Sequence, residues 1–530
     1  MRNSSHPITK KQKLSFIFNG KKYFGFKGDT LASALLANNV KTVGRSFKYH
    51  RPRGIFSAGS EEPNALVEIG EGPFKEPNTK ATNVELFDGL RASSQNFLGS
   101  VNFDLMAIND LLKNFIGAGF YYKTFMWPQK LWEKIYEPVI RKAAGLGKLS
   151  MEPDPSHYDK GYLHSDFLIV GSGISGLMSA LLLAETGSKI LLIEEDFILG
   201  GRLNSEKLMI NGEKSSVWVD RAVKKLKSFK NVRIFLRTVV YAAFDHGIFT
   251  ALEKKTDHIS VENSKPRQIN WKIYTKHCIL ASGAIERSIA FPQNDRPGIM
   301  LSGSVRTYAH RFGTYCGQKI AVYTNNNDGW KTASDLKDIG LEVKAVIDTR
   351  KEINALSSSI PSYLGQTIKR TYGRKGIKKI KLSSGRNLNV DCLAVSGGWS
   401  SNIHLTCHKR GKPIWDKNYK NFLPADRTEE NDIIPIGAAK GIFEIQNIIS
   451  DTNILILSLI KKLKLSAPKP IALSSSEEYY TCSLDLVSSS DASNSFIDLQ
   501  NDVTQKDIEL SFKEGFKSVE HLKRYSTLGM

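Results

Sequence analysis

Cysteine is scarce in this chain of 530 residues and absent from its first half, because the first cysteine stands at position 278. The five cysteines lie far apart, and none forms the C-x-x-C pair that is typical of structural zinc sites and redox disulfides. We therefore expect reduced thiols, no metal site and no dithiol chemistry. The cysteines are Cys278, Cys316, Cys392, Cys407 and Cys482.

Long apolar stretches are absent as well. The longest, residues 167–183 and 454–460, are interrupted by a glycine-rich turn or are shorter than the roughly 20 residues that cross a bilayer. Residues 1–20 contain no apolar core of the kind that a secretory signal has. We expect no membrane interaction and a cytoplasmic location.

Acidic residues are outnumbered, since 74 Lys and Arg against 53 Asp and Glu give a net charge of +21. Such an excess can attract nucleic acid or an anionic ligand, or it can simply reflect a lysine-rich surface. The basic residues are scattered, and neither a zinc-finger pattern nor an aromatic RNA-binding motif is present. We expect no nucleic-acid binding. Length and a globular composition, 41% hydrophobic and 24% charged, predict several domains.

The first 92 residues have the pattern of a small β-rich unit. Residues 13–26 alternate apolar and polar positions around Asn19-Gly20, a dipeptide that favours a tight hairpin turn. The apolar segment that follows has helical spacing, and Asp29 or Thr30 can cap its first turn. We expect a half-barrel or ubiquitin-like unit here.

A glycine fingerprint between two apolar strands is the clearest chemical motif. The first strand runs into Gly171-Ser172-Gly173-Ile174-Ser175-Gly176, which opens a helix. Gly171 suits the tight turn, Gly173 lets the backbone approach a pyrophosphate at the helix N-terminus, and Gly176 lets the helix pack on the strand. Glu194 ends the second strand, where a carboxylate can accept both ribose hydroxyls and repel a 2′-phosphate. The pattern predicts a dinucleotide site.

Further small-residue elements follow. Gly200-Gly201-Arg202 stands where flavoproteins with two dinucleotide-binding domains bring a second loop across the cofactor. Strands also run into Ser282-Gly283-Ala284 and into residues 433–441, where small residues let the backbone approach a ligand closely. Each of these strand ends can equally be a plain buried element.

A second strand–helix–strand unit spans residues 317–350, but its turn lacks the three glycines, so we expect a structural relic or a different ligand there. The whole pattern predicts an α/β protein with two nested Rossmann-like domains of the two-dinucleotide-domain flavoprotein type. The expected units are an N-terminal module (1–92), a helical connector and linker (93–160), a first dinucleotide-binding domain (161–300 and 395–460) and a nested second domain (301–394).

Several long, unusual segments, which cover nearly the whole chain, resemble the α subunit of heterotetrameric sarcosine oxidase. They are far more specific than a glycine fingerprint. Besides the fingerprint, they are residues 44–67, 84–96, 117–128, 282–313, 396–405 and 496–530.

The resemblance implies a complex of α, β, γ and δ subunits that oxidises the N-methyl group of sarcosine. The products are glycine, hydrogen peroxide and a one-carbon unit, which leaves as formaldehyde or as 5,10-methylenetetrahydrofolate. In this family the β subunit holds FAD, FMN lies at the α–β interface, and the α subunit binds NAD and carries a tetrahydrofolate domain. The resemblance implies no catalytic residue in this chain, and we do not expect it to be active alone.

The resemblance also places the NAD site on particular residues, with FAD as the alternative dinucleotide because glycine spacing does not distinguish the two. The site residues are Gly171, Ser172, Gly173, Gly176, Glu194, Glu195, Gly200, Gly201, Arg202, Gly283 and Ala284.

Two departures from the family matter. The chain stops at Met530, close to where the folate domain begins, so residues 461–530 look like a linker into a missing domain, and the chain looks like a fragment or a short reading frame. The N-terminal module resembles the ferredoxin-like module that binds a [2Fe–2S] cluster in related proteins. No cysteine precedes Cys278, and a cluster needs about four thiolates, so we expect no Fe–S cluster.

Other hypotheses stay open. The α subunits of proline, hydroxyproline and opine dehydrogenases share these modules, although residues 496–530 look like the approach to a folate domain that those subunits lack. A stand-alone pyridine-nucleotide disulphide reductase is disfavoured by the missing C-x-x-C pair. The basic segment from Arg45 to Arg53 is either a solvated surface or a strip that docks a β subunit or the FMN phosphate.

Overall fold

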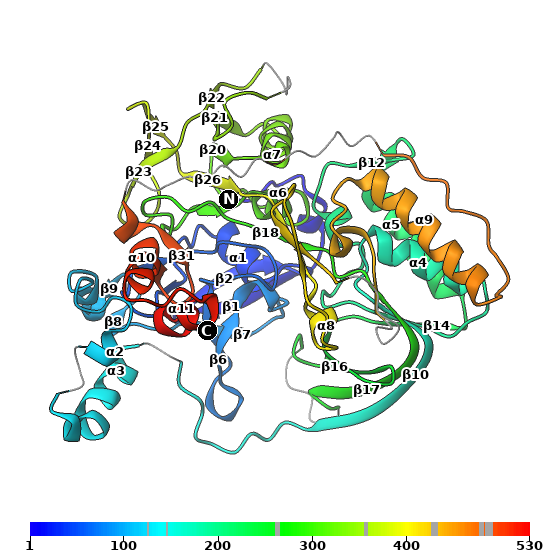
Figure 1. Cartoon of the computed structure of the whole chain (residues 1–530), viewed down its shortest axis with the longest axis horizontal. Helices are drawn as coiled ribbons and strands as arrows, with labels where there is room; N and C mark the ends of the chain where they lie inside the picture. The colour runs from blue at the N-terminus through cyan, green and yellow to red at the C-terminus, as the bar shows by residue number, and fades with distance from the viewer. Residues whose placement is uncertain are drawn as a thin grey trace.

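The chain folds around three larger sheets, shown in Figure 1, with smaller sheets beside them. The computed structural model describes residues 1–123, 127–144, 147–259, 265–353, 359–425, 433–475, 482 and 491–530. The N-terminal module (blue) lies centrally, with the helices of the fingerprint unit on one side and the C-terminal helices (red) on the other. The N-terminal β-rich module and the α/β architecture therefore follow the predicted order.

The N-terminal module is a five-stranded sheet in the order β2-β1-β7-β5-β6, with α1 (Leu31–Ala37) packed on it. Asn19 and Gly20 both have positive φ, 51° and 75°, which confirms the predicted hairpin turn. Thr30 caps α1 by accepting a bond from the Ser33 amide (3.1 Å), as predicted. The strands are β1 (Lys13–Phe18), β2 (Lys21–Phe26), β5 (Leu66–Ile69), β6 (Glu76–Lys80) and β7 (Leu90–Ser94).

The fingerprint lies in a seven-stranded sheet whose order is β14-β11-β10-β17-β16-β15, with β30 beside β17. Its central strands pair in parallel, and buried apolar side chains lie on both of their faces. Helices cover one of these two faces. The strands are β10 (Tyr158–Val170), β11 (Ile190–Ile193), β14 (Val232–Phe235), β15 (Thr238–Phe244), β16 (Ile248–Lys254), β17 (Gln268–Leu280) and β30 (Ile433–Pro435). The helices are α4 (Ile174–Ala184), α5 (Ser215–Ser228) and α9 (Ile445–Lys462), which lie side by side in Figure 1.

A second parallel sheet, in the order β19-β26-β20-β21-β22, is inserted between the strands of the first. A three-stranded antiparallel sheet, β23-β24-β25, lies next to it, and β18 pairs with β27 where the chain crosses between the two sheets. The elements are β18 (Ala284–Glu286), β19 (Ile299–Leu301), α6 (Ser302–His310), β20 (Lys319–Thr324), α7 (Asn327–Asp338), β21 (Glu342–Asp348), β22 (Ser362–Leu364), β23 (Ile368–Tyr372), β24 (Lys379–Leu382), β25 (Asn387–Asn389), β26 (Cys392–Ser396), β27 (Trp399–Ser401) and α8 (His404–Cys407). The boundaries of the five predicted units, residues 461–530 included, stay predictions.

The connector and the C-terminal segment are built from short elements. The connector has a 3-10 helix (Leu105–Asp110), α2 (Phe120–Lys123), a π-helical turn (Trp132–Tyr136) and α3 (Glu137–Ala143). The last part of the predicted linker is folded, with β31 (Phe496–Asp498), β32 (Val503–Thr504), α10 (Gln505–Lys513) and α11 (Val519–Ser526). A capping box of Thr504 and Asp507 starts α10. This part of the predicted linker thus has regular secondary structure.

The basic segment is largely buried, so the hypothesis of a solvated surface is wrong, whereas the hypothesis of a docking strip stays a prediction. Arg53 is 1% exposed and pairs with Asp295 and Asp502, while the Arg51 Nε lies 2.6 Å from Asp295 Oδ2. Removing a guanidinium charge from water is costly unless carboxylates pair with it. Here the paired carboxylates come from distant parts of the chain. Asp502 belongs to the C-terminal segment, which the basic segment therefore fixes to the rest of the protein.

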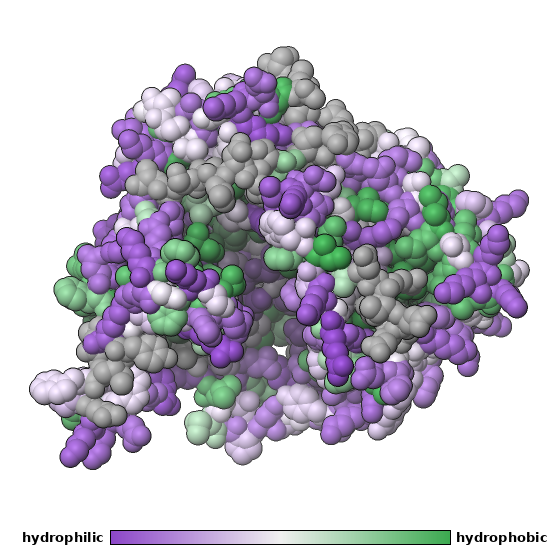
Figure 2. Space-filling model, in the orientation of Figure 1, coloured by the Kyte–Doolittle hydropathy of each residue, from purple (hydrophilic) through white to green (hydrophobic). Residues whose placement is uncertain are grey.

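Two further observations concern the described part of the chain only. No helix in it is long and apolar enough to span a bilayer. No group of three or more His, Cys, Asp or Glu residues in the same ranges is arranged to hold a metal ion. Figure 2 shows hydrophilic side chains over most of one face, with apolar ones gathered at the right over the helices of the fingerprint sheet.

Candidate functional site

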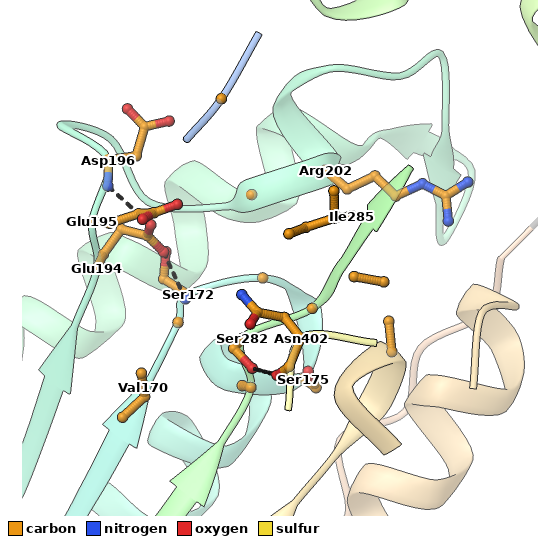
Figure 3. A pocket seen from close by; sticks show the side chains of 18 of the residues that line it. Val170, Ser172, Ser175, Glu194, Glu195, Asp196, Arg202, Ser282, Ile285 and Asn402 are labelled. Carbon is orange, nitrogen blue, oxygen red and sulfur yellow. Dashed lines mark hydrogen bonds between the residues drawn. The ribbon is translucent and has the colours of Figure 1, made fainter. Parts of the chain in front are cut away.

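A cavity of about 600 Å³ opens at the carboxyl ends of β10, β11 and β17. Ligands bind at this edge of parallel α/β sheets because the loops there leave a crevice between helix N-termini. Of the predicted site residues, Gly176 and Gly200 lie outside the lining. Gly171, Ser172, Gly173, Glu194, Glu195, Gly201, Arg202, Gly283 and Ala284 line the cavity, and Figure 3 shows several of them.

The three fingerprint positions differ in whether the surrounding structure leaves space for a side chain. A Cβ on Gly171, whose φ is 95°, would lie 2.4 Å from the Ala281 carbonyl oxygen, and one on Gly176 would lie 2.1 Å from that of Gly171. A Cβ on Gly173 would meet nothing within 4 Å. Gly171 and Gly176 are therefore required by packing, whereas Gly173 leaves open space beside the backbone.

The N-terminus of α4 faces this open space. Gly173 is the N-cap of the helix, and no side chain caps it. The first amides of a helix have no intrahelical acceptor, and the helix dipole adds a partial positive charge there. An anion such as a pyrophosphate fits this position.

Glu194 is held against the fingerprint loop. Its Oε2 accepts bonds from the Ser172 amide (2.8 Å) and hydroxyl (2.6 Å), and its Oε1 accepts one from the Asp196 amide (3.0 Å). Burial raises the pKa of Glu194 to about 7, although these hydrogen bonds favour the ionised form and partly offset the rise. Each carboxylate oxygen has two lone pairs, so Oε1 can still accept a ligand hydroxyl.

Acidic groups crowd this end of the cavity. Ser60, from the N-terminal module, donates to Glu195 Oε1 (3.1 Å), and Arg311 Nη2 lies 2.8 Å from Asp196 Oδ1. Burial, and the neighbouring Asp196 and Glu61 charges, raise the pKa of Glu195. A 2′-phosphate here would meet these carboxylates, whereas a ribose diol would donate to them.

The second glycine pair packs against the fingerprint. A Cβ on Gly201, whose φ is 51°, would lie 3.2 Å from Gly173 Cα, so the two loops approach each other closely. Arg202 points across the cavity, with its guanidinium 5.5 Å from the centroid of the Trp399 ring and its Nη2 3.2 Å from Asp328. On the opposite wall, the Ser282 hydroxyl donates to the Asn402 carbonyl (2.6 Å).

The sequence interpretation missed the far end of the cavity. Glu286 and Trp399 both line it, and they come from β18 and β27, which pair across more than a hundred residues of inserted chain. Glu286 Oε2 accepts a bond from the Gly303 amide (2.7 Å), while Glu286 Oε1 and Trp399 Nε1 are buried with no hydrogen-bond partner in the described part of the chain. Burial, and then the Asp328 charge, raise the pKa of Glu286 to about 8. A protonated Glu286 and the indole N–H are therefore two donors for a polar ligand group.

Behind this end lies a buried ion-pair cluster. Arg306, which is 0% exposed, lies 2.8 Å from Asp328, 3.5 Å from Glu206 and 3.8 Å from Asp335. Asp328 stands in the first turn of α7, where a second dinucleotide would place its phosphates. The Asn326 side chain already accepts bonds from the first α7 amides at 2.9 and 3.3 Å.

A glycine fingerprint on a parallel sheet, with a second parallel unit inserted into it, defines the class of proteins with two dinucleotide-binding domains. Residues 165–439 match the family described as pyridine nucleotide-disulphide oxidoreductase, and the chain belongs to this family. Residues 11–97 match "2Fe-2S iron-sulfur cluster binding domain", and residues 492–530 match "Sarcosine oxidase A3 domain".

Curated relatives confirm the resemblance to sarcosine oxidase α subunits. The chain is 41% identical over 525 residues to "Sarcosine oxidase subunit alpha" of Rhizobium meliloti and 31% identical over 550 residues to that of Corynebacterium sp. strain U-96. Each match covers 98% of this chain but only 53% and 52% of the relative. The chain thus spans about half the length of the curated relatives it matches.

The fold is also that of a solved amine dehydrogenase. L-proline dehydrogenase from P. horikoshii superposes with a TM-score of 0.67 over 98% of this chain and 88% of that one, at 19% identity. This likeness shows the shared fold of the whole chain and does not distinguish among amine substrates.

Proposed function

We propose that this chain is the dinucleotide-binding part of an α subunit of a sarcosine oxidase complex and that it binds NAD in the fingerprint cavity. The observation that carries the proposal is the open, uncapped N-terminus of α4 beside Gly173, on a chain that resembles sarcosine oxidase α subunits over nearly its whole length.

Different residues of the cavity would bind different parts of the dinucleotide. The α4 amides and the Gly173 backbone would hold the pyrophosphate, and Glu194 would accept a bond from the adenosine ribose. Glu195 and Asp196 disfavour a 2′-phosphate, which supports NAD over NADP. FAD fits the same elements and is the alternative ligand.

The far end of the cavity would hold the second base or ring of the dinucleotide. Glu286 and Trp399 supply two donors there, and Arg202 lies across the opening. Bound nicotinamide or flavin supplies hydride or electron transfer, while the protein positions and shields it. No cysteine is among the described residues that line the cavity, so disulphide reduction has no support here.

The proposal extends to the complex. Sarcosine would be demethylated with β, γ and δ subunits in the cytoplasm, with FMN at the β interface and tetrahydrofolate taking up the one-carbon unit. Exposed apolar side chains of the connector support a partner, because Leu111, Phe115 and Trp127 are 81%, 69% and 85% exposed. A [2Fe–2S] cluster is not proposed, since residues 11–97 contain no cysteine.

A related proline, hydroxyproline or opine dehydrogenase is the second candidate. The structural likeness to L-proline dehydrogenase supports it, whereas the match of residues 492–530 to the sarcosine oxidase A3 domain favours the first. Co-expression with the genomic neighbours, followed by mass identification of released cofactors and by assays with sarcosine and proline, tests both. Release of FAD without NAD, or turnover of proline in preference to sarcosine, would contradict the first proposal. Peroxide formation from sarcosine by the isolated chain would contradict the non-catalytic role.

A further inference from the structure

A second cavity, of about 660 Å³, lies apart from the fingerprint cavity and shares none of its lining residues. The buried basic segment forms one wall, residues 101–110 of the connector form another, and the turn between β23 and β24 closes a third side. Its volume is in the range of small-molecule sites.

Basic side chains dominate this second cavity. Five cationic residues line it against two acidic ones, Asp104 and Asp110. Both carboxylates are already engaged, since Asp104 Oδ2 lies 2.8 Å from His50 Nδ1 and Asp110 Oδ2 lies 2.8 Å from Arg51 Nη1. The cationic residues are Arg45, Arg51, Arg296, Arg374 and Lys375.

Two of these arginines bond only to neutral acceptors. Arg45 donates to the carbonyls of Val101 (2.8 Å) and His50 (3.0 Å). Arg296 donates to Thr371 Oγ1 (2.9 Å), to the Gly373 carbonyl and to Gln293 Oε1 (2.7 Å). These bonds orient the guanidinium groups toward the cavity wall but leave their charges without a carboxylate in contact.

The charges also crowd one another. Burial lowers the pKa of Arg45, the Asp104 charge opposes this shift, and the Arg374 charge adds to it. Burial likewise lowers the pKa of Arg296, with Asp295 opposing and the charges of Arg51 and Arg370 adding to the shift. Partly buried like charges held together by the fold gain from a counterion more than dispersed surface charges do.

We infer that this second cavity binds a small molecule with a phosphate group. A phosphate monoester concentrates about two negative charges on one group, and guanidinium forks bind its oxygens in pairs. Carboxylates offer one charge each, so an excess of cations at one point favours phosphate. Tyr49, Pro52 and Phe103 give the cavity an apolar side for the rest of the ligand.

Arg374 and Lys375 are the residues with which to test the inference. Both are exposed, and neither side chain makes a hydrogen bond or ion pair in the described part of the chain, so we expect their removal to leave the fold intact. The double variant Arg374→Ala/Lys375→Ala removes two charges from the cavity. Lys369→Ala/Lys378→Ala removes two exposed charges from the neighbouring strand and loop outside the lining and is the matched control.

The measurement is calorimetric titration of the full chain with inorganic pyrophosphate. All variants carry Gly173→Val, which blocks the fingerprint cavity and restricts the signal to the second one. We expect saturable binding that weakens about tenfold or more in Arg374→Ala/Lys375→Ala and is unchanged in the control. Without ligand, the melting temperature of Arg374→Ala/Lys375→Ala should stay the same or rise, because repulsion is relieved.

Absence of saturable binding, or equal weakening in both double variants, would overturn the site. Citrate titrated in parallel separates the two ligand chemistries. Tighter binding of citrate than of pyrophosphate would overturn the phosphate assignment. These outcomes are independent of whether NAD binds the fingerprint cavity.

Discussion

The two strand–turn–helix units of this chain share one geometry and differ at the start of the helix. At the end of β10, Gly173 begins α4 without a side-chain cap and beside open space. At the end of β20, Asn326 caps α7, and the Asp328 carboxylate lies in its first turn, paired with Arg306. The first helix can receive an anion from outside, whereas the second has its donors satisfied by the protein.

This difference shows how one supersecondary unit becomes either a ligand site or a structural support. A helix N-terminus attracts negative charge wherever it occurs. In the first unit an external phosphate can meet that demand, and in the second an internal carboxylate and its arginine meet it permanently. The expectation that the second unit is a relic or binds a different ligand stays a prediction, and the buried carboxylate favours the relic.

The largest effect should come from breaking the internal charge cluster of the second unit. Arg306→Met leaves three buried carboxylates without their common partner, which typically costs about 3–5 kcal/mol of unfolding free energy. Urea denaturation measures the loss. Arg524→Met, in an exposed pair with Glu520, is the control and should change stability by less than about 1 kcal/mol. If Arg306→Met lost no more unfolding free energy than the control, the buried ion-pair cluster would not be the interaction that stabilises the start of α7 in place of a bound anion.

The next effect concerns the open position of the first unit. Gly173→Val places a side chain where the pyrophosphate would approach, and its Cβ would meet nothing within 4 Å in the protein itself. We expect NAD to bind roughly a hundredfold more weakly, about 2.7 kcal/mol, in equilibrium dialysis, with little change in melting temperature. Gly44→Ala, whose Cβ would make ordinary contacts outside the cavity, should bind NAD normally. Full affinity in Gly173→Val would remove α4 as the anion site.

Glu194 should make cofactor binding depend on pH. Its pKa is raised from 4.5 to about 7, and a ribose hydroxyl donates to the ionised form, so NAD affinity should rise as pH increases from about 6 to 8 and then level off. Without ligand, the same shift means that the free energy of unfolding falls as pH rises from about 4.5 to about 7 and then levels off, because the unfolded chain ionises first. Glu194→Gln should weaken binding about tenfold at pH 8, about 1.4 kcal/mol, and abolish the pH dependence. An unchanged pH profile in Glu194→Gln would place the ribose elsewhere.

The smallest effect should come from the cap of α7. Asn326→Ala removes the acceptor for two helix amides and should lower stability by about 1 kcal/mol. It should not create NAD binding, because Asp328 still occupies the helix start. Asn418→Ala, an exposed position, should be neutral within about 0.5 kcal/mol. NAD binding gained in Asn326→Ala would mean that the cap alone closes the second unit.

Local patterns predicted much of the fold and part of the site. Asn19-Gly20 and Thr30 act within a few residues of themselves, so their hairpin and cap were predictable. The same holds for the fingerprint, where neighbouring residues set both the turn and the helix start. Glu286 and Trp399 were not predictable, because the strands that bring them together are separated by the inserted second unit.

The burial of the basic segment shows most clearly what could not be predicted from the sequence. Its charges suggest a surface strip, because side chains such as Arg53 are rarely buried unless they are paired. The partners are Asp295 and Asp502, more than two hundred residues away in the sequence, and no local sequence pattern predicts these pairs. The amino-acid order thus specifies turns, caps and the glycine loop, whose interactions are short in sequence. Which charges are neutralised inside, and which face an open cavity, follows from long-range packing, because an ion pair forms only where the fold brings its two members together.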